Sequence, residues 1–351
     1  MSKNYYHKRI GYIDALRGFA ILMIVFMHVE HFGFGITYDK SLWGSIIITF
    51  FLPTFFFISG FLAKGKEQMS SISLSKEIWK KAKYLIIPAL SFYALYYCVN
   101  KEEDFFLLFT KGPRCYWFTV ALFYIFTIYY VIQFLAQKLS PTTSEILLFS
   151  ISIGGLILYI GGTKFYHLDI CPILCFTNVC RYFWYFIIGH FCRSHYSTFT
   201  KVISHEIVKA VCIFLFIISF IISWNKLAIQ YSFIHIWLSE YLLWDLGTMT
   251  VILCFYHYRD YFESIKKIPH AFCFIGRRTF DIYLIHWFFI ANVNYLFKEK
   301  WIGITPNNIL ELSLVILFTV VIVSLCLLVS ATIRTSRILG LYFLGAKDHN
   351  Q

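Results

Sequence analysis

Long apolar runs alternate with short polar breaks along the whole chain. The runs are roughly 15 to 22 residues long, close to the length with which one α-helix crosses a bilayer. Residues such as Lys and Pro interrupt them. We therefore expect about ten transmembrane helices, near residues 12–31, 42–63, 83–99, 115–136, 145–161, 178–193, 207–224, 238–256, 277–296 and 309–331.

The composition supports this pattern. Hydrophobic residues make up 59% of the 351 positions and charged residues 14%, against about a quarter charged in soluble domains. A soluble protein has no interior that could bury so much apolar surface, and open sheets leave backbone groups that lipid cannot satisfy. The expected fold is an all-α, polytopic integral membrane helix bundle, with residues 1–351 forming a single membrane-embedded domain.

The positive charges indicate the orientation. With a cytoplasmic N-terminus, 22 of the 31 Lys and Arg residues fall in cytoplasmic segments and 9 fall outside. Cytoplasmic loops of membrane proteins carry such an excess, so both termini are expected in the cytoplasm. The formal net charge of +12 therefore reflects topology. It does not indicate nucleic-acid binding, because we find no soluble basic domain to carry that function.

The cysteines do not suggest a metal site. Most of the ten lie in apolar runs, where Cys acts as a small hydrophobe. Cys171, Cys175 and Cys180 cluster in an expected outer loop, where a disulfide is an alternative to inert thiols. Their spacing matches no zinc pattern of two close pairs. We expect no bound metal and no tightly bound cofactor.

The first helix carries residues that suggest chemistry. Arg17 and His28 project from one face of a helix, about 16 Å apart along its axis. A guanidinium suits bidentate phosphate binding, and an imidazole suits general-base work near neutral pH. The separation is also about the reach of a pantetheine arm, which joins a nucleotide pyrophosphate to a thioester. Alternatively, Arg17 anchors the helix at the cytoplasmic surface and His28 is a hydrogen-bonded interior residue.

The segment "IDALRGFAILMIVFMHV" resembles the opening helix of the acyltransferase-3 family of bacterial membrane acyltransferases. The hallmark of that family is an Arg, ten residues and a His, which Arg17 and His28 fit. Five further segments resemble family blocks in the same order: "LPTFFFISGFL" at 52–62, "KKAKYLIIP" at 80–88, "YWFTVALF" at 116–123, "RYFWYFIIGHF" at 181–191 and "GRRTFDIYLIHW" at 276–287. Thr119 and His190 depart from the residues usual in these blocks.

The resemblance implies O-acetyl transfer. An acyl group, usually acetyl, moves from a cytoplasmic acyl-CoA, which is a co-substrate, to a hydroxyl of a surface or exported glycan or glycolipid. The implied location is the bacterial cytoplasmic (inner) membrane, among its lipids. A transporter or flippase for a glycolipid or small metabolite is the alternative. The chain shows no repeated halves of the kind that transporters often have.

The resemblance also implies roles for particular residues. His28 would deprotonate the acceptor hydroxyl or relay the acyl group. The phosphates of the donor would bind at a cytoplasmic cluster of basic residues, the basic mouth, formed by Arg17, Lys80, Lys81 and Lys83. Ser59 would contact the donor through its hydroxyl group or allow a close approach of the backbone. Alternatively, the lysines are a positive-inside flank, and Ser59 with Gly60 serves helix packing.

Further polar and aromatic residues are candidates for supporting roles. The acceptor or a substrate tunnel would be lined by Arg181, Trp117, Tyr283 and His286. The acids that could support a catalytic His are Asp14, Glu240 and Asp281. Alternatively, Asp281 pairs with Arg277 or Arg278 at helical spacing. For Tyr283 and His286, the alternative is that they form interhelical hydrogen bonds. Trp117, Trp184, Trp237 and Trp287 are expected mainly in the interfacial aromatic belt, with stacking on a sugar ring as the minority alternative for Trp117. For Arg181 the alternative is snorkelling.

Overall fold

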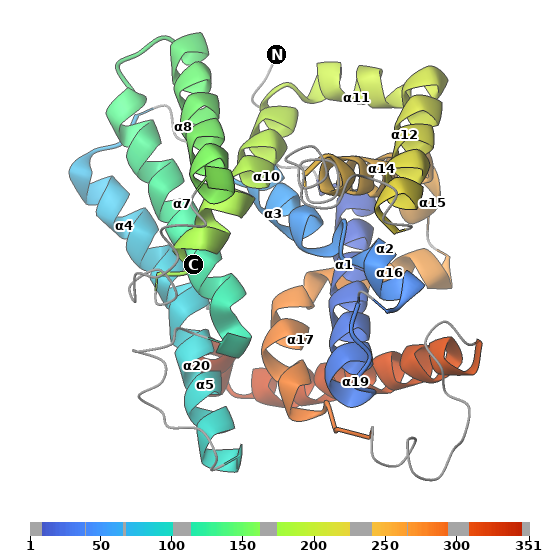
Figure 1. The fold of residues 1–351 in the computed structure, drawn as a ribbon. Helices are drawn as coiled ribbons and strands as arrows, with labels where there is room; N and C mark the ends of the chain where they lie inside the picture. The colour runs from blue at the N-terminus through green and yellow to red at the C-terminus, as the bar shows by residue number, and fades with distance from the viewer. Residues whose placement is uncertain are drawn as a thin grey trace. The chain divides into compact units, whose positions relative to one another are not determined.

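The computed structural model describes residues 9–38, 40–65, 68–100, 114–161, 174–224, 241–264, 266–293 and 309–345. Within these ranges the regular structure is helical, without a β-strand. Seven helical segments of the described residues are long and apolar enough to cross a membrane. The chain is therefore an all-α, polytopic membrane protein, as predicted (Figure 1).

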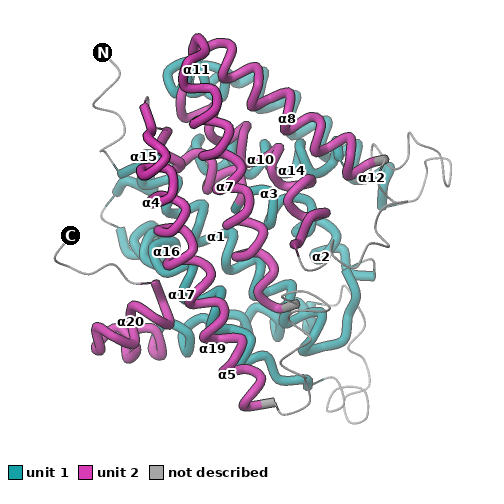
Figure 2. The backbone as a smooth tube through the Cα atoms, turned by 90° about the vertical axis from the view of Figure 1, so that its left-hand side faces the viewer, with its two compact units in different colours: residues 1–55, 195–327 teal, residues 56–194, 328–351 magenta. Residues whose placement is uncertain are grey.

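The chain divides into two compact units (Figure 2). Unit 1 comprises residues 1–55 and 195–327, and unit 2 comprises residues 56–194 and 328–351. Each unit has its own packed helices, which are described separately below.

The seven segments are Gly11–Gly33, Leu42–Phe61, Ser71–Val99, Trp117–Ala136, Pro141–Ile160, Glu206–Trp224 and Ile309–Thr335. The other three expected spans coincide with α10 (Phe176–Ser194), α14 (Leu243–His257) and α17 (Thr279–Ile285). These helices are either too short or too polar to meet the same criteria. Parts of the expected spans, residues 238–240 and 294–296, lie outside the described residues. The number of ten spans stays a prediction.

Unit 1 is built around α1 (Gly11–His28), which continues as a π-helical turn over Val29–Gly33. Its side chains Leu16, Ala20 and Ile21 are fully buried. The neighbours that pack against α1 are α2 (Leu42–Ile47), α14, α15 (Arg259–Phe262), α16 (Lys267–Arg277) and α17. The remaining helices of the unit are α11 (Tyr196–Ser204), α12 (Glu206–Trp224) and the first part of α19 (Ile309–Thr335).

Two glycines bring α1 and α16 into close contact. A Cβ atom on Gly18 would overlap the carbonyl oxygen of Phe272, and a Cβ atom on Gly276 would overlap that of Asp14. The backbones can approach this closely only because both positions lack a side chain. Arg17 lies between Asp14 and Gly18 in the sequence. The crossing of α1 and α16 therefore fixes the part of α1 that carries the guanidinium of Arg17.

Unit 2 contains a second crossing of the same kind. A Cβ atom on Gly60 of α3 (Phe51–Phe61) would overlap the carbonyl oxygen of Phe186 on α10, and one on Gly189 would overlap that of Phe57. The other helices of the unit are α4 (Ser71–Lys81), α5 (Ile87–Asn100), α7 (Trp117–Ala136), α8 (Pro141–Gly161), the last part of α19 (residues 328–335) and α20 (Arg337–Leu344). The packing alternative for the Ser59–Gly60 pair therefore has direct support at Gly60.

The helix expected over 42–63 is interrupted. It consists of α2 and α3 with turns over residues 48–50 between them. Pro53 lies in the first turn of α3, where its missing N–H costs nothing. A continuous helix would bring the ring of Pro53 against the carbonyl group of Thr49, so the chain breaks before it.

Two other helices differ from expectation. The helix expected from residue 83 begins at Ser71, because Ser70 caps it by accepting from the N–H of Ser73 at 3.2 Å. The helix expected over 277–296 ends early, with α17 followed by a 3-10 turn over His286–Phe288. There the backbone finds other partners, since the N–H of Val293 donates to the carbonyl of Gly33 at 3.0 Å.

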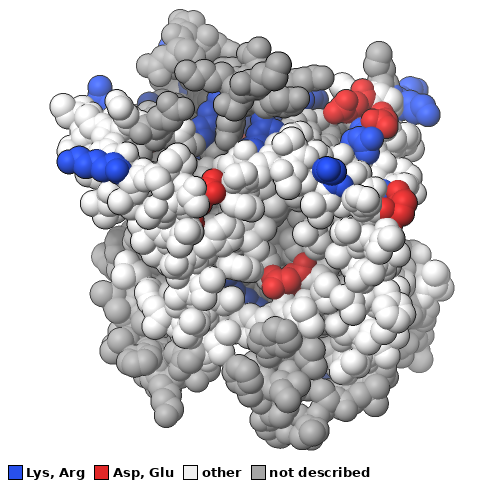
Figure 3. Space-filling view, turned by 90° about the horizontal axis from the view of Figure 1, so that it is seen from above, with Lys and Arg blue, Asp and Glu red and all other residues white. Residues whose placement is uncertain are grey.

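The surface suits a lipid environment. Apolar side chains of α12 and α19, among them Phe214 and Leu317, are exposed, and the mean hydropathy of these two spans is 2.5 and 3.1. On the face drawn in Figure 3, charged side chains are scattered over a largely uncharged surface. Lipid accepts such apolar surface directly.

Candidate active site

The helix α1 places Arg17 and His28 as the sequence predicts. Because the α-helix is continuous over Gly11–His28, the two side chains project from one face about 16 Å apart along the axis. Arg17 is half-buried, and its guanidinium makes no hydrogen bond or ion pair with another described residue. The charged side chains of Asp14 and Arg9 interact electrostatically with the guanidinium of Arg17. These two also form an ion pair of 3.2 Å with each other.

At the other end of the same helix, His28 meets His286. The Nδ1 atom of His28 lies 2.8 Å from the Nε2 atom of His286. The two rings are nearly parallel, at 8°, with their centroids 5.1 Å apart. His286 is fully buried, whereas His28 is half-buried. We call these two residues the histidine pair.

A backbone carbonyl fixes the tautomers of the histidine pair. The oxygen of Ile282 can only accept, so the Nδ1 atom of His286 carries the proton that it donates to that oxygen at 3.0 Å. In the neutral ring, Nε2 of His286 is then an acceptor, and Nδ1 of His28 donates to it. The Nε2 atom of His28 is thus left with a lone pair, which is the form that a general base requires.

Aromatic rings surround the histidine pair. The ring centroid of Trp287 lies 4.4 Å from that of His28 and 5.1 Å from that of His286. Phe32 packs edge-on against Trp287 at 5.3 Å. Tyr283 is buried, and its ring centroid lies 6.1 Å from that of His286. The structure therefore brings together His28 with two of the predicted tunnel residues, His286 and Tyr283.

Two buried acids lie just beyond the histidine pair. Glu30, on the π-helical turn, is 1% exposed and Glu311 of α19 is fully buried. Ser41 Oγ donates to Glu30 Oε1 at 2.5 Å and accepts from the N–H of Gly44 at 3.0 Å. The carboxyl group of Glu311 is an electrostatic neighbour of Glu30. Sequence reasoning did not assign this acid pair a role, although the rule that ionisable groups in apolar runs are functional candidates could have found Glu311.

The acids that sequence reasoning did select are engaged elsewhere. Asp14 pairs with Arg9, and the buried carboxylate of Asp281 lies 3.6 Å from the guanidinium of Arg278. The alternative pairing of Asp281 with a neighbouring Arg is therefore the one observed. Glu240 lies outside the described residues.

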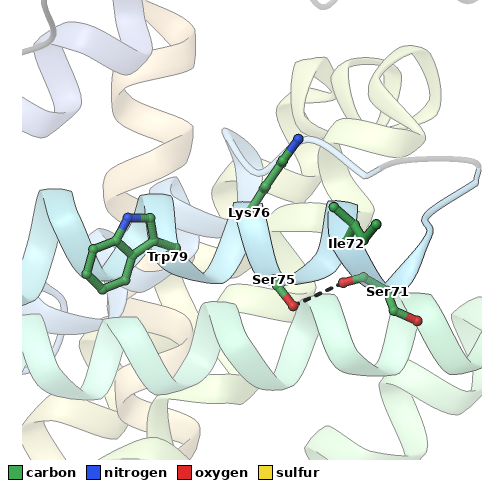
Figure 4. Close-up of a pocket in the computed structure, with 5 residues that line it drawn as sticks. All are labelled: Ser71, Ile72, Ser75, Lys76 and Trp79. Carbon is green, nitrogen blue, oxygen red and sulfur yellow. Dashed lines mark hydrogen bonds between the residues drawn. The ribbon is translucent and has the colours of Figure 1, made fainter.

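The other predicted residues belong to unit 2. Lys80 is exposed, Lys83 and Ser59 are half-buried, and Lys81 places its ammonium 3.3 Å from the ring centroid of Phe126. A surface hollow along α4 is lined by Ser71, Ile72, Ser75, Lys76 and Trp79 (Figure 4). This hollow contains none of the predicted donor residues, so it adds no support to the basic mouth.

Two predicted acceptor residues of unit 2 come together around Tyr182. Arg181 donates to the hydroxyl of Tyr159 at 2.8 Å and lies over the ring of Tyr182, 5.8 Å from its centroid. Trp117 stacks on the same ring at 5.9 Å. The arrangement combines aromatic faces with a guanidinium, groups that suit a polyhydroxyl ligand.

None of the described residues form a group of three or more His, Cys, Asp or Glu side chains that could hold a metal ion. Among the described residues of unit 1, the candidate site combines two imidazoles in contact with each other and a guanidinium further along α1.

The helices and their apolar surfaces define a polytopic membrane protein. The family model of acyltransferase-3, described as an acyltransferase domain, matches residues 10–331. This match covers most of the chain, which therefore belongs to that family and is a membrane acyltransferase. Searches of curated proteins and of solved structures found no match.

Proposed function

We propose that this acyltransferase moves an acetyl group from cytoplasmic acetyl-CoA to a hydroxyl of a surface or exported glycan or glycolipid. The observation that carries the proposal is the histidine pair, in which His286 holds His28 with its Nε2 lone pair available. The proposed location is the bacterial cytoplasmic membrane.

In the proposed reaction, Nε2 of His28 takes the proton of the acceptor hydroxyl while the hydroxyl oxygen attacks the thioester carbonyl carbon. A C–O bond forms, and the carbonyl π electrons move onto the carbonyl oxygen. When the tetrahedral intermediate collapses, the C–S bond breaks and the CoA sulfur takes the proton from His28. His286 accepts the Nδ1–H of His28 throughout, so it is a positioning residue.

The donor would lie along α1. Arg17 has a guanidinium with no partner among the described residues, and a guanidinium suits the bidentate binding of a phosphate group. The distance of about 16 Å from Arg17 to His28 along the helix is about the reach of a pantetheine arm. Lys80, Lys81 and Lys83 remain proposed contributors to phosphate binding.

The test uses the purified full chain in nanodiscs with acetyl-CoA and a glycan fraction from host membranes. Release of CoA and a mass increase of one acetyl group on the glycan are measured together. We expect His28→Gln to lose about 10²- to 10⁴-fold in transfer rate, because the amide cannot accept a proton near neutral pH. CoA binding should persist in this variant.

His31→Gln is the matched control. His31 follows on the same segment but forms no part of the histidine pair, so this variant should keep its activity. Near-normal transfer in His28→Gln would remove His28 from the chemistry. Absence of acetyl-CoA consumption by the wild-type protein with any glycan fraction would overturn the proposed function.

A further inference from the structure

The indole ring of Trp287 is the third ring of the candidate site. It follows His286 directly in the chain, and its centroid lies 4.4 Å from that of His28 at an interplanar angle of 34°. Sequence reasoning placed Trp287 in an interfacial belt, where the indole N–H would meet water or lipid headgroups. The structure instead places the ring against the proposed base.

The indole N–H of Trp287 lacks an acceptor. The Nε1 atom is buried and has no hydrogen-bond partner among the described residues. An indole nitrogen can only donate, and buried polar groups are nearly always paired. An unpaired donor on a ring that packs against the proposed base therefore points to an oxygen that arrives with the substrate.

The chemistry of acyl transfer identifies this oxygen. The attack of a hydroxyl on a thioester places negative charge on the former carbonyl oxygen, and enzymes stabilise that charge with fixed N–H donors. The Nδ1–H of His28 is already given to His286, and the Nδ1–H of His286 is given to Ile282. The proton that Nε2 of His28 takes up during the attack goes to the leaving sulfur, so the indole of Trp287 is the remaining N–H donor on these three rings.

We propose that the Nε1–H of Trp287 donates a hydrogen bond to the carbonyl oxygen of the acyl group and stabilises the oxyanion of the tetrahedral intermediate. This rests on the proposed acyl transfer. The indole keeps its proton throughout: the hydrogen bond strengthens when the C–O bond forms and the π electrons move to the oxygen. It weakens again when the C–S bond breaks and the carbonyl returns.

Hydrolysis of acetyl-CoA, in which the acyl group goes to water, distinguishes oxyanion stabilisation by Trp287 from binding of the sugar acceptor. The oxyanion forms whether the acyl group goes to a sugar hydroxyl or to water, whereas contacts with the sugar matter only for the sugar. In Trp287→Phe, which keeps an aromatic ring but loses the N–H, we expect kcat to fall about 10²- to 10³-fold. The fall should be the same for glycan acetylation and for acetyl-CoA hydrolysis without acceptor, with CoA affinity unchanged.

Trp184→Phe is the matched control. The Nε1 atom of Trp184 is also buried without a partner, but its ring packs against Phe149 in unit 2, so both rates should stay at the wild-type value. If Trp287→Phe folds poorly, a benzothienyl alanine at position 287 keeps the shape of the indole and replaces the N–H with sulfur. The same loss of kcat is expected.

Three outcomes would overturn the inference. Unchanged rates in both Trp287 variants would make the indole a packing residue. A raised KM for the glycan with normal hydrolysis would make it an acceptor contact. A loss of CoA binding would make it a donor contact. Failure of the proposed function itself is distinct, because the wild-type protein would then neither acetylate glycan nor hydrolyse acetyl-CoA.

Discussion

Ser41 Oγ donates a hydrogen bond of 2.5 Å to Oε1 of Glu30 in the interior of unit 1, and the buried carboxyl group of Glu311 is an electrostatic neighbour of Glu30. Through Ser41, which caps α2 and donates to Glu30, the two acids tie the turn after His28 to both α2 and the start of α19. We infer a structural role next to the proposed base.

We expect replacement of the Glu311 carboxyl group by an amide to be tolerated, and truncation of the Glu311 side chain to destabilise the protein. Glu311→Gln keeps the size of the side chain and its capacity to hydrogen-bond, so the melting temperature in detergent should stay near that of the wild type. Glu311→Ala leaves Glu30 without this neighbour and opens a cavity. It should lower the free energy of unfolding by about 1–3 kcal/mol. Equal melting of Glu311→Ala and the wild type would contradict this role.

The crossing of α1 and α16 makes a second prediction. In Gly276→Ala, the new Cβ atom overlaps the carbonyl oxygen of Asp14, so the two helices must separate. We expect a loss of about 1–3 kcal/mol in thermal unfolding, as for other overpacked sites. Gly154→Ala in α8 is the control. Its Cβ atom meets nothing within 4 Å, and it should be neutral or stabilising because Ala favours helix more than Gly.

The positioning role of His286 is tested by partial rescue. In His286→Ala, the Nδ1–H of His28 loses its acceptor and the ring is free to turn. A displaced catalytic group typically costs about a hundredfold. His286→Gln can place a carbonyl oxygen near the former Nε2 position and accept from His28, so it should retain more activity than His286→Ala. Equal rates in the two variants at equal melting temperature would exclude this role.

The fold class could be predicted from the sequence because the length and polarity of apolar runs decide it. The spacing of Arg17 and His28 within one helix was equally accessible, since a continuous helix fixes the relation between two of its own residues. Local breaks were harder to predict. Pro53 lies at the interruption between α2 and α3, but the apolar run continues through it, and the length of that run by itself predicts one continuous helix.

The partners of His28 could not be predicted. His286 and Trp287 reach it only through the packing of α17 against α1, and Glu311 reaches Glu30 from a helix far along the chain. These contacts depend on tertiary packing, which residue spacing within one helix does not contain. The sequence therefore indicates His286 as a residue that lines the acceptor site or a substrate tunnel, whereas its contact with His28 in the structure suggests that it orients the proposed base.

The orientation in the membrane remains a prediction from the positive charges. A reporter fused after residue 351 should be active on the cytoplasmic side, because 22 of the 31 Lys and Arg residues fall in the expected cytoplasmic segments. A reporter fused after residue 165 should lie on the outer side. A C-terminal reporter on the outer side would require an odd number of spans and would contradict the ten-helix topology.

Arg17 offers the most direct test of the donor site. Its guanidinium is half-buried without a partner among the described residues. Arg17→Lys keeps the charge but loses the two-pronged geometry that matches a phosphate. Loss of one charge-assisted hydrogen bond costs about 1.5–3 kcal/mol, so the Kd for CoA should rise roughly ten- to a hundredfold.

The control for this variant is Arg9→Lys. Arg9 is largely exposed and pairs with Asp14, so its replacement should leave the Kd for CoA unchanged. Calorimetric titration of CoA into both variants, at the same ionic strength, separates a bound phosphate from a general loss of positive charge. An unchanged Kd in Arg17→Lys and also in Arg17→Gln would mean that Arg17 anchors α1 at the cytoplasmic surface. The phosphates would then have to bind elsewhere, with the lysines of α4 as the next residues to substitute.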